Sequence, residues 1–302
     1  MSVKGDPRWP SAASLLTDSP VAGRPRLSLL GVHTHSTSVT PRSSTSTPAA
    51  VRAALERFST YSFEEDIDLC GRLDIVDHGD VRDPDGPEGL SRVRQALDFI
   101  DLSDGPVAIL GGDNAATYAA LSSIASDDPG GWGLITLDAH LDIRDGWSNG
   151  SPVRQLLEFG LDGHRVVQIG LADFSNSGDY ASRARDAGLT FIPRSAVRSH
   201  TMESVVQRAL SIAGAGDRPV YVDIDLDVVD QSAVPGCPAA APGGLSPDQL
   251  RHAARLLASD PRVKAIDLTE VDVERDDSDQ RTVRLMALAL LEICVGVARR
   301  PQ

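Results

Sequence analysis

The 302-residue sequence is poor in cysteine, in aromatic side chains and in positive charge. Its three cysteines, Cys70, Cys237 and Cys294, form no Cys-x-x-Cys pair and are too few for a disulfide framework in a chain of this length. Aromatic residues make up only 4% of the chain, although 41% of all residues are hydrophobic, which is enough for a large core. The cysteine usage indicates a reducing compartment, and we expect the protein in the cytoplasm.

Positive charge is scarce, because 29 Lys and Arg residues stand against 43 Asp and Glu residues and give a formal net charge of −14. Binding to nucleic acids or to anionic membrane surfaces rests mainly on Lys and Arg, so this balance argues against both kinds of partner. Long hydrophobic runs are also missing. The most apolar stretch, residues 285–297, contains Glu292 and is too short to span a bilayer, and residues 1–20 show no secretory signal.

Short apolar runs alternate with helical patterns along most of the chain. This alternation predicts an α/β fold in which a parallel sheet of eight strands has helices on both faces. The expected strands are residues 27–32, 73–77, 107–110, 133–137, 165–169, 190–192, 220–224 and 263–268. The expected helices are residues 49–58, 90–102, 117–126, 153–159, 181–187, 202–213, 247–258 and 281–298. We expect an irregular segment over residues 1–24 and a single domain over residues 25–302.

Two of the expected helices begin with capping signals. Thr47 precedes Pro48, which suits a cap followed by proline in the first turn. Ser246 is followed three residues later by Gln249, which predicts a capping box.

Three of the expected strands end in polar residues of an unusual kind. They lead into the sequences Gly111-Gly112-Asp113-Asn114, Asp138-Ala139-His140-Leu141-Asp142 and Asp223-Ile224-Asp225-Leu226-Asp227. Ligands of open parallel sheets bind at the carboxyl ends of the strands, so these residues fall where chemistry is expected. Carboxylates placed close together after buried strands repel one another, and burial adds to the cost of their charges. A bound cation would remove both penalties.

The spacing of these residues favours a pair of divalent ions. Asp138, His140 and Asp142 follow one another at every second position, and Asp223 and Asp225 repeat this spacing on another strand. Four carboxylates balance two divalent ions. Oxygen ligands with one imidazole suit Mn²⁺, while Zn²⁺, Fe²⁺ and Co²⁺ remain open. Two such ions would activate a water molecule as a nucleophile at neutral pH.

The order of Gly-Gly-Asp, Asp-Ala-His-x-Asp, Asp-x-Asp and a late glutamate, Glu270, resembles the ureohydrolases, the family of arginase, agmatinase and formimidoylglutamase. The resemblance runs from about residue 27 to residue 297. It implies a three-layer α/β/α sandwich with an eight-stranded parallel sheet, two Mn²⁺ ions and a small-molecule substrate with a planar cationic head. It also implies a homo-oligomer, either a trimer or a hexamer.

The resemblance also implies roles for individual residues. Asp138 and Asp223 would bridge the two metal ions, Asp142 would bind the first ion, and His140 and Asp225 would bind the second. Glu270 would pair with the flat cationic head of the substrate, so Glu270 and Asp138 are the expected catalytic residues. Asp113 would orient its loop.

Two departures from the family pattern bear on function. Asn114 stands where the family has a histidine, and it is either a weaker ligand of the first ion or only a cap of the following helix. The segment Gly146–Gln155 lacks the histidine that arginases and agmatinases carry there. Its Ser151-Pro152-x-x-Gln155 pattern is closer to the formimidoylglutamase branch.

The proposed substrate of that branch is N-formimidoyl-L-glutamate, an amidine with two carboxylates. Arg144 and Arg154 are the candidates for binding these carboxylates, and Asn149 is a further candidate substrate ligand. Two alternatives remain open at this point. One is a guanidino-compound hydrolase that releases urea, as agmatinase and arginase do, and the other is a metal-poor, non-catalytic homologue, for which Asn114 is the motivating feature.

Overall fold

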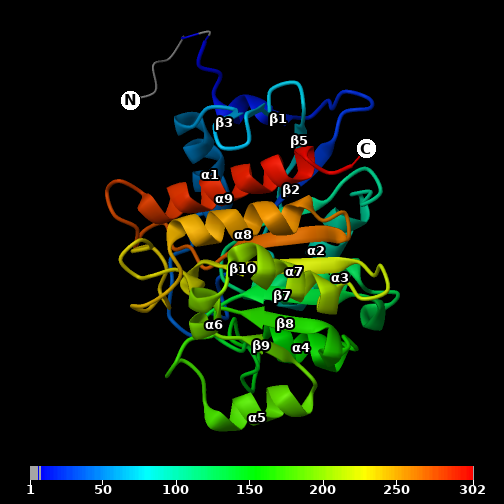
Figure 1. The fold of residues 1–302 in the computed structure, drawn as a ribbon, viewed down its shortest axis with the longest axis vertical. Coiled ribbons are helices and arrows are strands. Elements are labelled where there is room, and N and C mark those ends of the chain that lie inside the picture. Colours follow the sequence, from blue (N-terminus) through cyan, green and yellow to red (C-terminus); the bar gives the residue numbers. More distant parts are fainter. Residues whose placement is uncertain (1–5, 7, 302) are drawn as a thin grey trace.

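The computed structural model describes residues 6 and 8–301 and shows a parallel sheet of nine strands between two layers of helices (Figure 1). The strands lie in the order β1-β5-β2-β6-β11-β10-β7-β8-β9. Their bounds are β1 Leu16–Thr17, β2 Arg26–Val32, β5 Asp74–Asp80, β6 Val107–Gly111, β7 Gly133–Leu137, β8 Val166–Ile169, β9 Thr190–Ile192, β10 Val220–Asp225 and β11 Val263–Thr269. The α/β sandwich expected from the sequence is confirmed.

The helices divide between the two faces of the sheet. One face is covered by α1 (Thr47–Ala54), α6 (Arg194–Ser199), α7 (Met202–Ala213), α8 (Pro247–Ser259) and α9 (Arg281–Ala298). The other is covered by α2 (Gly86–Asp98), α3 (Ala115–Ile124), α4 (Pro152–Phe159) and α5 (Gly178–Asp186). Figure 1 shows α8 and α9 side by side along one face. Within the described part of the chain, no helix is long and apolar enough to cross a membrane.

The structure corrects the expected strand count from eight to nine. The added strand is β1, which has two residues and pairs with β5 at the edge of the sheet. It lies in the segment expected to be irregular, where Ala12 and Leu15 are buried. Two residues are too few to show an alternating pattern, so the sequence gave no signal for them. Residues 1–5 and 7 of that segment lie outside the described residues.

Three other local features differ from expectation. Ser46, not Thr47, caps α1 by accepting a hydrogen bond from the Ala49 backbone, and the Thr47 hydroxyl instead donates to the carbonyl of Val271. Helix α6 and a small antiparallel hairpin, β3 (Tyr61–Ser62) and β4 (Ile67–Asp68), are additional elements. The capping box of Ser246 at the start of α8 is present as expected.

The register of the central strands explains how the sheet presents polar groups at one edge. Side chains at alternate positions point to the same face, so β7, β10 and β11 build successive rows on the face covered by α3. The row farthest from the carboxyl edge is mostly apolar, the next row is polar and buried, and the third row lies at the carboxyl ends of the strands. The rows are Leu134, Tyr221 and Ala265; then Thr136, Asp223 and Asp267; then Asp138, Asp225 and Thr269.

We expect Gly296→Ala to destabilise the protein, because α9 packs against α8 at this glycine. A Cβ atom there would lie 2.5 Å from the carbonyl oxygen of Arg255 and 2.7 Å from the Cβ of Ala258, so the two helices would have to move apart. Overpacking of this kind costs about 1–3 kcal/mol. Urea unfolding would measure it. The matched control is Gly178→Ala at the start of α5, where the added Cβ meets nothing within 4 Å, and equal stability of the two variants would contradict the prediction.

Candidate metal centre and substrate cavity

Asp138, His140 and Asp227 form the tightest group of potential metal ligands at the carboxyl edge of the sheet. One ligand atom of each lies within 4.8 Å of the others. The His140 Nδ1 atom is 2.7 Å from Asp227 Oδ2 and 3.5 Å from Asp138 Oδ1. Both carboxylates are almost completely buried, whereas the His140 side chain is 30% exposed. The group therefore faces the cavity through its imidazole.

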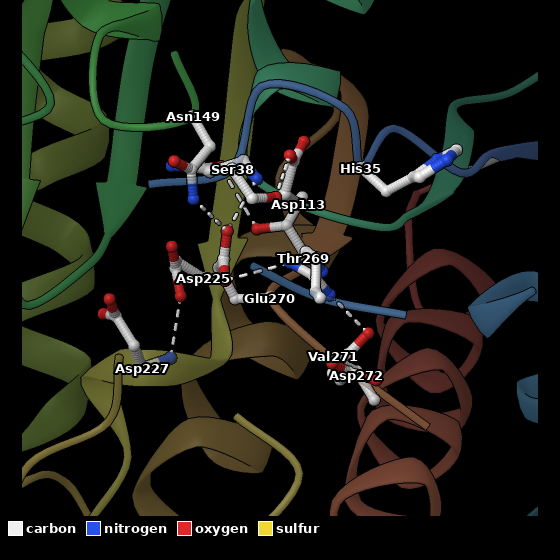
Figure 2. Close-up of polar contacts among 12 residues, drawn as sticks. His35, Ser38, Asp113, Asn149, Asp225, Asp227, Thr269, Glu270, Val271 and Asp272 are labelled. Atoms are coloured by element: carbon white, nitrogen blue, oxygen red, sulfur yellow. Dashed lines mark hydrogen bonds and ion pairs between the residues drawn. The ribbon is translucent and has the colours of Figure 1, made fainter. Parts of the chain in front are cut away.

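Asp142 and Asp225 lie at the same cavity. Asp225 accepts a hydrogen bond from the backbone N–H of Asp227 at 2.7 Å (Figure 2). Asp142 has a left-handed backbone with φ of 51°, which is uncommon outside glycine and is found preferentially at functional sites. Both residues line the cavity together with His140 and Asp227.

The structure places Asp223 one row below the strand-end candidates Asp138 and Asp225. Asp223 points into the buried polar row below the edge, where it lies opposite Asp267 of β11, and it does not line the cavity. Asp227, two residues beyond Asp225, lies beside His140 and lines the cavity, as a second ligand from this segment would have to do. The positions of the three aspartates therefore favour Asp225 and Asp227 as the candidate ligand pair over Asp223 and Asp225. The strand pattern alone did not show where β10 ends, so all three aspartates of the Asp-x-Asp-x-Asp sequence fitted the spacing.

Asn114 is the N-cap residue of helix α3, but its side chain makes no capping hydrogen bond to the helix backbone. Its side-chain N–H donates to Asp142 Oδ2 at 2.5 Å, and its amide oxygen accepts from the hydroxyls of Thr117 and Thr269. Asn114 thereby holds the carboxylate of a candidate metal ligand. The neighbouring Asp113 accepts from the Ser38 hydroxyl at 2.5 Å (Figure 2), which ties its loop to the loop after β2.

Glu270 follows β11 and is only 3% exposed, again with a left-handed backbone, at φ of 63°. Its Oε1 atom accepts from the Asn114 backbone and from the Asn149 side chain, each at 2.9 Å (Figure 2). Its Oε2 atom pairs with the Arg42 guanidinium at 3.0 Å. The expected binding residue Asn149 therefore lines the cavity and orients Glu270, and Arg42 is a partner that sequence reasoning missed.

The two candidate arginines differ in their surroundings. Both lie near a cavity of about 580 Å³, a size typical of small-molecule sites, but only Arg144 lines it. The Arg144 guanidinium has no hydrogen-bond partner among the described residues. Arg154 donates to both carboxylate oxygens of Glu158 at 2.7 Å and to the carbonyls of Arg144 and Gly146. The expectation that Arg154 binds substrate is corrected: it fastens the loop that presents Arg144.

The balance of burial and neighbouring charges raises the pKa values of Asp138, Asp225 and His140. Burial, with the neighbouring charge of Asp227, raises the pKa of Asp138 to about 7. Burial also raises the pKa of Asp225, and the charge of Asp227 adds to it. For His140, burial lowers the pKa, but the carboxylates of Asp227 and Asp138 outweigh it and raise the value to about 12. Without a metal, protons partly neutralise the carboxylates.

The residues fit a divalent cation. Asp138 Oδ2 is buried and has no hydrogen-bond partner within residues 6 and 8–301, so its charge is uncompensated at that atom. The ligand atoms are carboxylate oxygens and one imidazole nitrogen, a set that suits Mn²⁺. Four carboxylates, those of Asp138, Asp142, Asp225 and Asp227, would balance two divalent ions.

Comparison with known proteins agrees with the fold and with the family resemblance of the motifs. The arginase family model matches residues 25–296. A formimidoylglutamase of Halalkalibacterium halodurans is 33% identical over 279 residues, which cover 89% of this chain and 86% of the relative. The crystal structure of formimidoylglutamase from Bacillus subtilis has a TM-score of 0.89 at 29% identity and covers 98% of this chain and 94% of its own. A Trypanosoma cruzi formiminoglutamase solved with Mn²⁺ has a TM-score of 0.87 at 22% identity, with coverages of 97% and 100%.

The chain belongs to the arginase family. The resemblance of its motifs to that family, and to the formimidoylglutamase branch within it, is confirmed, as is the expectation of an enzyme.

We expect Asp227→Asn to lose bound Mn²⁺ and Asp223→Asn to retain it, because only Asp227 lies beside His140 at the cavity. Elemental analysis of the purified variants after Mn²⁺ loading and gel filtration would measure the bound ions per chain. Asp223→Asn serves as the matched control, since it removes one charge from the same strand end. Loss of metal in Asp223→Asn with retention in Asp227→Asn would restore the original assignment.

We expect the affinity for Mn²⁺ to rise as the pH increases from 6 to 8. A metal ion must displace the proton of Asp138, whose pKa lies at about 7, and that of His140, whose pKa lies at about 12 in the metal-free site. At pH 6 both groups are mostly protonated, and at pH 8 Asp138 is mostly ionised. Calorimetric titration with Mn²⁺ at several pH values would measure the trend. An affinity independent of pH would show that neither group binds the ion.

Proposed function

We propose that this chain hydrolyses an amidine C–N bond of N-formimidoyl-L-glutamate and releases L-glutamate and formamide. The observation that carries the proposal is the unpaired Arg144 guanidinium, which lines the same cavity as the carboxylate and imidazole cluster. A substrate with a carboxylate at one end and a planar amidinium at the other matches this arrangement. The names of the formimidoylglutamase relatives support the choice.

We infer that Asp138, His140, Asp142, Asp225 and Asp227 hold two Mn²⁺ ions. When bound, such ions lower the pKa of water and stabilise negative charge that develops on the reacting centre. Asp138 and Asp225 would contribute the two carboxylates at the strand ends, and Asp142, Asp227 and His140 would contribute the ligands from the following segments. Asn114 contributes by orienting Asp142 through its side-chain N–H.

The other residues of the cavity bind and orient the substrate in this proposal. Glu270 has two carboxylate oxygens with about four acceptor sites, of which three are used, so one remains for an amidinium N–H. Asn149 fixes the direction of that carboxylate. Arg144 pairs with a substrate carboxylate in the geometry that a guanidinium favours. Water adds to the amidine carbon, the bond to the glutamate nitrogen breaks, and this nitrogen gains a proton and leaves as an amine.

The cytoplasm and a trimeric or hexameric assembly remain proposals as well. The scarcity of cysteine supports the reducing compartment, and the family resemblance supports the oligomer. Size-exclusion chromatography with light scattering would measure the assembly.

We expect the Mn²⁺-loaded protein to release glutamate from N-formimidoyl-L-glutamate, and Arg144→Ala to raise KM for this substrate about 10- to 100-fold. Loss of a hydrogen-bonded charge pair costs about 1.5–3 kcal/mol, which corresponds to that range. The matched control is Arg218→Ala on the surface, where Arg218 pairs only with Asp128.

Two outcomes would favour the alternatives. Release of urea from arginine or agmatine, with no release of glutamate, would indicate a guanidino-compound hydrolase. Absence of both activities in a protein that binds less than one metal ion per chain would indicate the metal-poor, non-catalytic homologue.

A further inference from the structure

Arg42 is a buried arginine in the loop between β2 and α1, and its side chain is only 1% exposed. One terminal nitrogen lies 3.0 Å from Glu270 Oε2, and the other donates to the carbonyl of Val271 at 2.5 Å. Glu270 lines the cavity, while Arg42 lies behind it. A buried ion pair therefore stands directly at the wall where the substrate head would bind.

The loop that carries Arg42 is fastened to the chain after β11. Ser43 donates to Asp272 through its backbone N–H at 3.1 Å and through its hydroxyl at 2.6 Å. The Thr47 hydroxyl donates to the Val271 carbonyl at 2.7 Å, and Arg275 donates to the Pro41 carbonyl at 2.8 Å. Figure 2 shows Glu270, Val271 and Asp272 in sequence on the segment that receives these bonds. Hydrogen bonds of the residues before and after Arg42 in the chain thus hold it against Glu270.

The charge of Arg42 changes what the cavity can attract. A lone buried carboxylate at Glu270 would give the cavity one uncompensated negative charge, whereas the pair with Arg42 is neutral. In the proposed metal centre, four carboxylates balance two divalent ions. Among these groups, Arg144 then remains as the uncompensated side chain, and its charge is positive.

We propose that Arg42 is a specificity-determining residue that makes this cavity select anionic substrates over polycationic ones by neutralising Glu270. The inference rests on the proposed function, because it assigns a charge class to the substrate of that site. N-formimidoyl-L-glutamate carries two carboxylates and one amidinium, for a net charge of −1. A linear guanidino amine such as agmatine carries +2 and is repelled by the uncompensated charge of Arg144, with no net negative charge at the Arg42–Glu270 pair to attract it.

The test is a charge series at the Arg42–Glu270 pair in the Mn²⁺-loaded protein. Arg42→Gln leaves the pair at −1, Glu270→Gln leaves it at +1, and the double variant Arg42→Gln/Glu270→Gln is neutral like the original. Calorimetry would give the dissociation constants of agmatine and of glutarate, a dianion with the carbon chain of glutamate. Elemental analysis would verify equal metal content.

We expect the ratio of the agmatine constant to the glutarate constant to be highest in Glu270→Gln and lowest in Arg42→Gln. The two extremes should differ at least about tenfold, since the ligands differ by four charges and the site is only partly screened by solvent. The original protein and the double variant should lie between them. The matched control Arg218→Gln removes a surface charge and should leave the ratio unchanged.

Ratios that agree within twofold across the series would overturn the inference. If Arg42→Gln does not fold, the comparison of Glu270→Gln with the double variant still decides, because only the charge of residue 42 differs between them. Failure of the original protein to hydrolyse N-formimidoyl-L-glutamate would overturn the proposed function, while the charge dependence of ligand binding would be measured independently of it.

Discussion

The concentration of carboxylates at the carboxyl edge of the central strands is the constraint on which the rest of this site depends. Asp138, Asp142, Asp225 and Asp227 are each no more than 6% exposed, and their mutual repulsion raises the cost of burying them. Divalent cations remove that cost. The buried rows below this edge pack the strands in register. The strands therefore hold the four carboxylates in fixed positions close to one another.

The groups around the metal centre serve to fix carboxylates in direction and charge. Asn114 holds Asp142, Asn149 holds Glu270, and Arg42 neutralises Glu270 from behind. The left-handed backbones of Asp142 and Glu270 are strained conformations that persist because these contacts hold them. Among the cationic side chains of the described residues that line the cavity, Arg144 has no ion-pair partner, so in the proposed function its guanidinium would set the direction in which an acidic substrate binds.

Eight of the nine strands could be predicted from the sequence, because buried parallel strands are short apolar runs between helical patterns. The Asp-x-His-x-Asp sequence also identified its part of the site, since its spacing needs no knowledge of the partner strand. The choice between the pairs Asp223–Asp225 and Asp225–Asp227 could not be made from the sequence, because the three aspartates share one spacing. The end of β10 and its register against β11 decide which of them lie at the cavity.

The sequence by itself determined the fold class and the family and predicted a metal-binding chemistry, because these depend on local patterns and on motifs within a few residues. The tertiary structure alone showed that Asp227 lies beside His140, that Arg154 fastens a loop and that Arg42 reaches Glu270 across 228 positions of the chain. Contacts of that kind arise from the order of strands in the sheet. Their partners lie too far apart in the sequence to share a pattern, so only folding brings them within hydrogen-bond distance.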